Sequence, residues 1–503
     1  MKKEWKPDYK DKGTYLRERS TEQKGVDVLT STREIMIGSG DAVFHTDVNY
    51  GMWLGNKEFS KAPFSVDMKG SMVVQKIKIG YIQRSVAPGE NIQAAINEVY
   101  AGGGGEIILQ NGVHYPGADI VLYSGVYLSG QNINGCIIDF LGAPFGIKAM
   151  GTNAYTAGTV SVNNGSTTVT GAGTAWTAGM ATRNIMLSGY WYGIQSVNVG
   201  AQTLELSVPF ADANIAGASY TIADTISDII IKQFTVRSSS ASAIEIRYCT
   251  WLKISDVLSQ ESLVGLDIRD SSGFTTDDTY CLYNYSNFYF NNFHYSFMFG
   301  AGSIATLAGH GLEFYNCSDI ILEGYYVIGS VGDGIHLTNC STILFLGDSI
   351  KGNGGQGAEL DSGNNRIQFL SCAFLNNGSD GIRLTATSDN CQVSGCQFVN
   401  NGGYGWNILA NTCDYNSFIG DQFVSNVSGK FFNAGTNTVN NDASELQSYT
   451  VALLPTTYPI GSTTYASNGR KAGEGPGAGT GVMVFFDNAS KWIACDTGTQ
   501  VQA

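Results

Sequence analysis

The sequence predicts an all-β protein organised around a parallel β-helix, a solenoid of stacked parallel strands. The main observation is a phrase that recurs as GHGLEF, GDGIHL, GQGAEL, SDGIRL and GYGWNI. The glycines at its third position are spaced by 23, 23, 24 and 24 residues and are Gly311, Gly334, Gly357, Gly381 and Gly405. Such a period, with glycine and asparagine turns, is typical of stacked coils. A leucine-rich repeat has a similar period, but its Leu/Asn consensus is absent.

Composition supports this fold class and narrows the function. The chain of 503 residues has 63 glycines, 9 prolines and 14% charged residues, which suits turns and strands better than long charged helices. Its formal charge of -14 argues against binding to nucleic-acid phosphates or anionic membranes. The polar start MKKEWKPDYKDKGTY lacks the apolar core of a signal peptide, and no apolar run is long enough for membrane insertion. We therefore expect a soluble protein made in a cytoplasm.

Changes in pattern divide the chain into six segments. They are an extended arm (1–35), a small β module (36–80), a capping helix with the first coils (81–151), an inserted antiparallel β domain (152–223), the main β-helix (224–445) and a C-terminal β module (446–503). The arm is charged and lacks apolar periodicity. The helix is expected from PGENIQAAINEVY, whose apolar residues have helical spacing. The insertion alternates apolar and polar residues between hairpin-like turns, so that the coil spacing is lost.

The glycine series assigns the two faces of each strand. Side chains alternate along a strand, so the apolar residues one and three after each glycine face the core. The second residue then points outward. Down the stack this outward column reads Glu245, Asp267, Tyr289, Glu313, His336, Glu359, Arg383 and Asn407. The ten cysteines mostly follow the repeat and form no CxxC pair, so we interpret them as small core residues rather than as disulfides or metal ligands.

Glu313, His336 and Glu359 are the first candidates for catalysis. Equivalent residues of neighbouring coils lie about 4.8 Å apart, so the two glutamates are expected about 9.6 Å apart with the histidine between them. Inverting glycosidases hold two carboxyl groups at about 6.5–9.5 Å. Arg383 and Tyr315 are candidates for orienting an acidic sugar, with Tyr289 as a further binding residue. The competing interpretation is a ladder of alternating charges that only avoids repulsion.

Other candidate residues lie outside the column. Trp176 and Trp191 of the inserted domain are expected either to stack on sugar rings or to form its core. Asp277, Asp278 and Asp361 are candidates for a calcium site, although no loop has a specific ligand pattern. We expect no other cofactor.

Asp277-Asp278, the GHG of residues 309–311 and Arg366-Ile367-Gln368 resemble the DD, GHG and RIK signatures of polygalacturonases. This resemblance implies acid/base carboxylates at Asp277 and Asp278, assisted by His310. The family's NTD element is missing and Gln368 replaces its lysine. The 32 residues from Asp278 to His310 are not a whole number of coils. A turn residue before the repeat glycine is the alternative interpretation of His310.

Three segments resemble bacteriophage proteins. AVFHTDVNYGMWLGNKEFSKAPFSVDMKG is similar to a segment near the start of phage and prophage tail and fibre proteins, and YASNGRKAGEGPGAGTGV resembles a terminal module of phage structural proteins. The helix followed by a GVHY turn at residues 112–115 resembles the start of right-handed, pectate-lyase-like β-helices, including tailspikes. The resemblance implies a homotrimeric virion appendage. It would attach to a tail, baseplate or other virion protein through residues 36–80 and recognise bacterial surface polysaccharide.

Three functions remain open from the sequence. The first is an adhesin that binds host polysaccharide for adsorption without turnover. The second is a depolymerase, an endo-acting hydrolase or lyase that degrades capsule or O-antigen. The third is a structural fibre or decoration protein whose β-helix acts only as a spacer.

Overall fold

The computed structural model describes residues 29–31, 34–39, 42–47, 49–56, 58–62, 64–67, 69, 72–74, 82–441, 448–454 and 463–502. Most of the expected arm, residues 1–28, lies outside this range. The chain divides into two units, residues 1–81 and 82–503. In the described part of the chain, no helix has the length and apolar character needed to span a bilayer.

The first unit contains a six-stranded antiparallel sheet. Its strands follow in sequence order as β1 (Leu29–Ser31), β2 (Glu34–Ser39), β3 (Ala42–Asp47), β4 (Gly51–Leu54), β5 (Phe64–Val66) and β6 (Met72–Val74). Trp53 is buried and stacks on His45 with ring centroids 3.9 Å apart. The sheet begins at Leu29, because β1 pairs with β2 in register Leu29↔Met36. The expected arm over 1–35 therefore extended too far.

The second unit opens with β7 (Ile82–Val86) and the helix α2 (Ile92–Ala101). Asn91 caps the helix by accepting the Ala94 N–H at 2.9 Å. The apolar face of α2 is buried in the same core as the first coils. The helix thus covers the end of a core that stacked coils would leave open.

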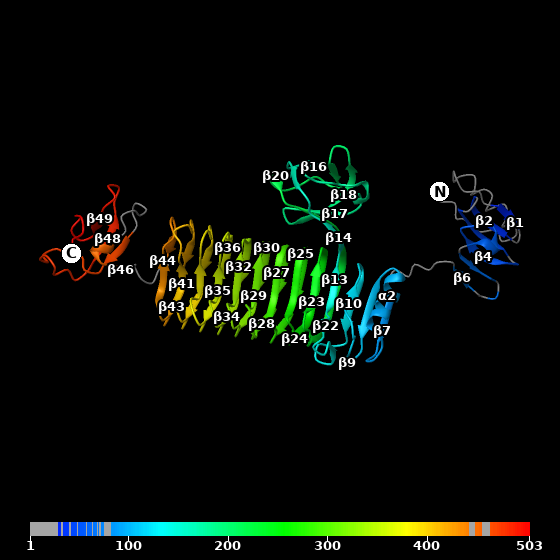
Figure 1. The fold of residues 1–503 in the computed structure, drawn as a ribbon, viewed down its shortest axis with the longest axis horizontal. Coiled ribbons are helices and arrows are strands. Elements are labelled where there is room, and N and C mark those ends of the chain that lie inside the picture. The colour runs from blue at the N-terminus through cyan, green and yellow to red at the C-terminus, as the bar shows by residue number, and fades with distance from the viewer. Residues whose placement is uncertain are drawn as a thin grey trace, which may run out of the picture. The chain divides into compact units, whose positions relative to one another are not determined.

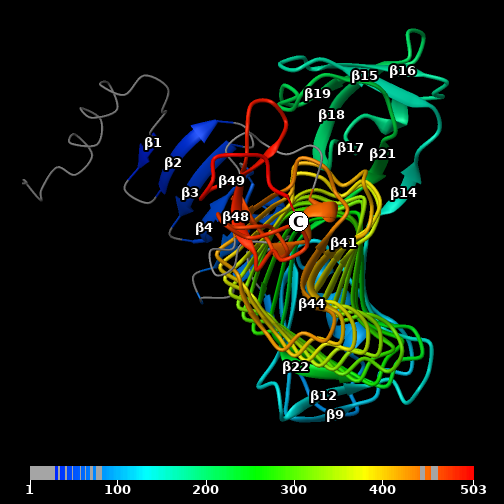
Figure 2. The same ribbon diagram turned by 90° about the vertical axis from the view of Figure 1, so that its left-hand side faces the viewer.

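Each coil contributes strands to three parallel sheets. Within a sheet, the strands of successive coils lie side by side along the solenoid (Figure 1), so the coils lie behind one another in the end-on view (Figure 2). Sheet 1 consists of β10 (Ile120–Leu122), β13 (Ile147–Met150), β23 (Ser242–Arg247), the first halves of β25 (Val264–Asp277) and β27 (Ser286–Phe299), β29 (Leu312–Tyr315), β32 (Ile335–Thr338), β35 (Ala358–Leu360), β38 (Ile382–Leu384), β41 (Tyr404–Ile408) and β44 (Gly429–Asn433).

Sheet 2 consists of β7, β8 (Gly105–Leu109), β11 (Val126–Gly130), most of β22 (Ile226–Arg237) and β24 (Cys249–Gln260), the second halves of β25 and β27, β30 (Ser318–Glu323), β33 (Ser341–Leu346), β36 (Asn365–Leu370), β39 (Gln392–Ser394), β42 (Ser417–Ile419) and β45 (Val439–Asn441). Sheet 3 consists of β9 (Gly112–His114), β12 (Cys136–Asp139), the ends of β22 and β24, β26 (Tyr280–Leu282), β28 (Gly302–Ile304), β31 (Tyr326–Ile328), β34 (Ser349–Lys351), β37 (Ala373–Leu375), β40 (Gln397–Val399) and β43 (Gln422–Val424).

The core is the one that the glycine series predicts. The residues one and three after the repeat glycines are fully buried, from Leu312 and Phe314 to Trp406 and Ile408. The fold class is confirmed. All ten cysteines are free thiols, nine of them buried and one, Cys495, exposed in the C-terminal module. One local prediction was wrong, because residues 112–114 of the expected GVHY turn form β9, which pairs with β12 of the next coil.

The inserted segment forms an eight-stranded antiparallel sheet with its own core. It leaves the solenoid after β13 and returns to it at β22, so it lies at the corner between sheets 1 and 2. In sheet order the strands are β14 (Thr152–Tyr155), β21 (Thr221–Asp224), β17 (Asn184–Leu187), β18 (Tyr190–Asn198), β19 (Thr203–Leu206), β16 (Thr168–Ala172), β15 (Thr159–Val162) and β20 (Ile215–Ala218). We call residues 152–224 the insert.

The C-terminal module contains four strands. They are β46 (Ser448–Tyr449), β47 (Thr463–Ala466), β48 (Val482–Phe486) and β49 (Trp492–Ala494). The β46–β47 pair is parallel and the other two pairs are antiparallel. Val484, Phe486 and Trp492 are buried in its core.

Candidate functional site

The candidate site is the outward face of sheet 1 at β29, β32, β35 and β38. Glu313 is registered against His336, His336 against Glu359, and Glu359 against Arg383. This is the order that the repeat predicts. Because the strands are in register, side chains from four successive coils form one row on the same face.

Glu359 is held by an arginine from the next coil. One of its oxygens, Oε1, accepts hydrogen bonds from Arg383 Nη2 at 2.6 Å and Nε at 3.1 Å. Its other oxygen lies 4.0 Å from His336 Nδ1. Burial raises the pKa of Glu359 above its ordinary value, even though Arg383 opposes this shift by favouring the carboxylate. The carboxyl group is therefore more readily protonated than an exposed glutamate.

Glu313 lies next to two tyrosines. Ser286 Oγ donates to its Oε1 at 2.6 Å, and the Tyr315 hydroxyl donates to Oε2 at 3.3 Å. The rings of Tyr315 and Tyr289 have centroids 5.4 Å apart, and the Arg269 guanidinium lies 4.8 Å from the centre of the Tyr289 ring. Glu313 was expected to be exposed, but only 8% of it is, because these neighbours cover it. It points away from the core without being free in solvent.

His310 joins the column from the loop before β29. Asp333 Oδ2 lies 3.2 Å from His310 Nδ1 and 3.4 Å from His336 Nδ1. The two imidazole rings have centroids 4.7 Å apart. Burial opposes the charge on Asp333, but the two adjacent histidines and the hydrogen bond from the Gln356 N–H outweigh it and hold the pKa of Asp333 well below its usual range. For His310, burial disfavours the cation, but Asp333 outweighs this and raises the pKa of the imidazole.

His310 also heads a ladder of hydrogen bonds between the loops before sheet 1. Its Nδ1 accepts the backbone N–H of Asp333 at 3.0 Å. In the same way Asp333 Oδ1 accepts the N–H of Gln356, Gln356 Oε1 that of Asp380, and Asp380 Oδ1 that of Tyr404. Each of these residues precedes a repeat glycine. The turn interpretation of His310 and its contact with the column are therefore compatible.

Sequence reasoning missed Asp333. The repeat assigns it only the position before Gly334, with no direction for its side chain. Within the described residues, His310, Asp333 and His336 are the group whose possible ligand atoms all lie within 4.8 Å of one another, so they are the residues best placed to hold a metal ion. A signal was present in the sequence, since polar residues precede four of the five repeat glycines.

Comparison with protein families identifies the solenoid. A family model described as the right-handed beta helix region matches residues 221–374 and 304–445. The solenoid is a right-handed β-helix. A search among curated protein sequences found no significant match.

Several solved structures are similar to this chain at low sequence identity. The A-module of mannuronan C-5 epimerase AlgE4 from Azotobacter vinelandii is 18% identical over 69% of this chain and 94% of its own, with a TM-score of 0.45. PfbA, a surface adhesin of Streptococcus pneumoniae, is 12% identical over 71% and 94%, with a TM-score of 0.42. The Gp54 tailspike of Acinetobacter baumannii bacteriophage AP22 is 11% identical over 76% and 73%, with a TM-score of 0.42.

The β-helix does not assemble the polygalacturonase-like set. Asp277 ends β25 on sheet 2, and Asp278 follows it in the turn before sheet 3. His310 lies beyond sheet 3, in the loop that leads to β29. Asp361 follows β35 on sheet 1, where its Oδ1 accepts a hydrogen bond from Thr385. Asp361 therefore lies on a different side of the β-helix from Asp277 and Asp278, and the three aspartates of the expected calcium site are not brought together.

The two tryptophans of the insert have different surroundings. Trp176 is 1% exposed in the core of the insert, and its Nε1 donates to the Tyr220 hydroxyl at 2.8 Å. Of the two interpretations of Trp176, the structure supports the core role, because a ring that is almost fully buried cannot stack on a sugar. Trp191 is partly buried and packs edge-on against Tyr248 of the β-helix, with centroids 6.3 Å apart.

Proposed function

We propose that this protein is a bacteriophage appendage of the tailspike or fibre type that binds bacterial surface polysaccharide for adsorption. The observation that carries the proposal is the column on sheet 1. It places Tyr289 and Tyr315 beside Glu313, with Glu359 and Arg383 two and three coils further along the same face. Aromatic rings pack against the apolar faces of sugars, while charged and amide groups bind their polar rims.

The place of the protein in the virion rests on the sequence. The segment of residues 42–70 resembles the start of phage tail and fibre proteins, which supports attachment of the first unit to a tail, baseplate or other virion protein. The same resemblance supports a homotrimer in the virion. A polysaccharide-binding surface on a different unit from the attachment module suits an adsorption protein.

Polysaccharide hydrolysis is the second candidate function. Glu359 has a raised pKa, as a general acid requires, and Glu313 lies two coils away at about 9.6 Å by strand spacing. In an inverting reaction Glu359 would give its proton to the glycosidic oxygen as the C–O bond breaks. Glu313 would take a proton from the water that attacks the anomeric carbon. The histidines beside Glu359 would keep the site polar.

Incubating the purified full chain with a panel of capsular polysaccharides and O-antigens tests both functions. Binding without new reducing ends supports the adhesin, and new reducing ends support the hydrolase. Absorbance from unsaturated uronates would instead indicate a lyase. A spacer fibre would bind none of the polysaccharides.

Single substitutions test whether the binding or cleavage takes place at the column. Glu359→Gln and Glu313→Gln should each abolish cleavage, or weaken binding where there is no cleavage. Glu323→Gln on sheet 2 is a matched control because it is an exposed glutamate on a neighbouring face. If both column variants bind and cleave like the unmodified protein, the column is not the site.

A further inference from the structure

The insert is fixed against the β-helix by interlocking contacts. Gly189, at the turn between β17 and β18, sits on the imidazole of His294, and a Cβ at this position would lie 2.5 Å from the ring carbon Cγ. The Tyr190 ring stacks on Tyr295 with centroids 3.3 Å apart. Nδ2 of Asn292 donates to the Met186 sulfur at 3.3 Å. The two surfaces therefore hold a defined distance and orientation.

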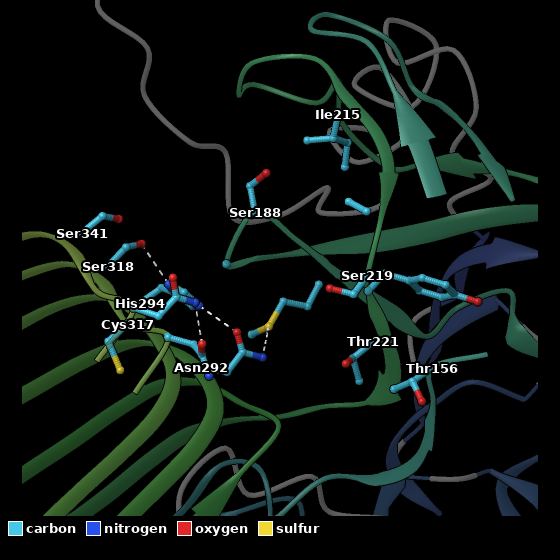
Figure 3. Close-up of a pocket in the computed structure, with 16 residues that line it drawn as sticks. Thr156, Ser188, Ile215, Ser219, Thr221, Asn292, His294, Cys317, Ser318 and Ser341 are labelled. Carbon is cyan, nitrogen blue, oxygen red and sulfur yellow. Dashed lines mark hydrogen bonds between the residues drawn. The ribbon is translucent and has the colours of Figure 1, made fainter. Parts of the chain in front are cut away.

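These contacts border a pocket of about 570 Å³ between the insert and the corner of sheets 1 and 2 (Figure 3). One wall comes from β20, β21 and the β17–β18 turn. The other comes from residues at the start of sheet 2 strands and from the asparagines of the corner. Two of these, Asn316 and Asn339, have left-handed backbones with φ of 54°, which asparagine tolerates better than most residues. Ligand sites commonly have volumes of about 300–1,000 Å³.

The side chains that line the pocket are uncharged at neutral pH. Among the described residues, the lining contains no aspartate, glutamate, lysine or arginine. Burial lowers the pKa of His294 to about 4, so its imidazole is neutral, and Nε2 lies 3.0 Å from the amide oxygen of Asn292. Burial also raises the pKa of the Cys317 thiol. Behind the lining, the carboxylates of Asp270 and Asp319 accept hydrogen bonds from Asn292 Nδ2 and Ser318 Oγ. In a chain with a net charge of -14, such a surface disfavours phosphate and carboxylate ligands.

The lining offers the chemistry of a neutral sugar. Hydroxyl and amide groups supply donors and acceptors from both walls, and Ile215 and Met186 supply apolar surface; the polar members are Thr156, Ser188, Ser219, Thr221, Asn316, Ser318, Asn339 and Ser341. We propose that this pocket binds a neutral pyranose residue, a hexose or N-acetylhexosamine, as a second saccharide subsite distinct from the charged column.

The pocket adjoins the column along the chain. Asn316 follows Tyr315, whose hydroxyl contacts Glu313, and Asn339 follows Thr338, whose Oγ1 lies 3.4 Å from His336 Nε2. A polysaccharide with a charged and a neutral sugar can thus place one at the column and the other in the pocket. This assignment of two sugar types rests on the proposed function.

Saturation-transfer NMR with the full chain tests the pocket directly. The probes are glucose and N-acetylglucosamine, with glucuronic acid as the charged comparison. At least one neutral sugar should bind, and Ser219→Trp, which fills the pocket from the insert, should reduce its signal at least fivefold. Ser341→Phe, which narrows the opposite wall, should do the same. Ser196→Trp is the control, an exposed serine on β18 that does not line the pocket.

The outcomes separate the two proposals. Loss of the neutral-sugar signal in both pocket variants but not in Ser196→Trp supports the pocket. Absence of any neutral-sugar signal, or a signal that both pocket variants leave unchanged, overturns it. If neutral sugars bind as expected while no polysaccharide of the panel binds, the proposed adsorption function fails and the pocket stands.

Discussion

Arg383 binds the carboxylate of Glu359 across the space between two coils, with two donors on one oxygen at 2.6 and 3.1 Å. Both side chains are mostly buried, Glu359 more so than Arg383. A charge in such a position depends on its partner, because removing one member leaves the other poorly solvated. A substitution in this pair should therefore change both the stability of the β-helix and any chemistry that Glu359 performs.

Replacing Arg383 by methionine should destabilise the β-helix by about 1–3 kcal/mol, the usual cost of losing hydrogen bonds to a charged group. The midpoint of thermal unfolding measures this. Combining Arg383→Met with Glu359→Gln should recover much of the loss, because no unpaired charge remains. Lys351→Met, an exposed lysine on sheet 3, is the control. Equal destabilisation by the control would show that the pair has no special role.

Asp348 should make stability fall as pH rises. Burial raises the pKa of this carboxyl to about 8, although the Tyr325 N–H donates to its Oδ1 at 2.7 Å. Between the unfolded pKa of about 3.9 and the folded value, the native state keeps a proton that the unfolded state has lost. Asp348 alone then lowers the free energy of unfolding by about 1.4 kcal/mol for each unit that the pH rises between these two pKa values.

Asp348→Asn should remove that decrease, because the amide does not titrate and has nearly the same shape. Thermal unfolding midpoints between pH 5 and 9 provide the comparison. Asp278→Asn is the control, since Asp278 is exposed in a turn and asparagine accepts its φ of 43°. An Asp348→Asn curve parallel to that of the unmodified protein would contradict a raised pKa at this position.

Trp176 should be essential to the insert. Trp176→Ala removes a ring that is 1% exposed and should cost about 3–5 kcal/mol in the stability of the insert. Limited proteolysis should then cut within residues 152–224 faster than in the unmodified protein. Trp251→Ala, which truncates a ring that is 73% exposed, should have little effect. Similar proteolysis of both variants would argue against the core role.

Tyr315 should contribute to polysaccharide binding. Removing an aromatic face that packs on a sugar costs about 1 kcal/mol, so Tyr315→Ala should weaken binding about fivefold. Isothermal titration calorimetry with a polysaccharide that the protein binds measures this change in affinity. Tyr326→Ala is the control because Tyr326 is exposed on sheet 3. Equal losses in the two variants would remove sheet 1 as the preferred surface.

The repeat made much of the column predictable. In a β-helix, residues one period apart in sequence become neighbours in space, so the glycine series places Glu313, His336 and Glu359 in register without a structure. Alternation along each strand then separates core from outward residues. The burial of Glu313 was not predictable in this way, since it depends on the side chains of Ser286 and Tyr315.

The contribution of the loops was harder to predict. His310 and Asp333 precede the strands, where side-chain direction no longer follows strand alternation. Their meeting with His336 depends on a loop path that brings each side chain to the backbone of the next coil. The sequence shows that these residues recur with the period of the repeat, but it does not show in which direction their side chains point.

By itself, the sequence determined the period, the core face, the outward column and the presence of an insertion, because all of these follow from local spacing. The tertiary structure decided that Trp176 is core, that Asp277 and His310 lie apart, and that Tyr190 docks on Tyr295 to border a neutral pocket. These contacts form between segments that are not related by the repeat period. Their formation depends on how complementary surfaces pack, which no spacing in the sequence encodes.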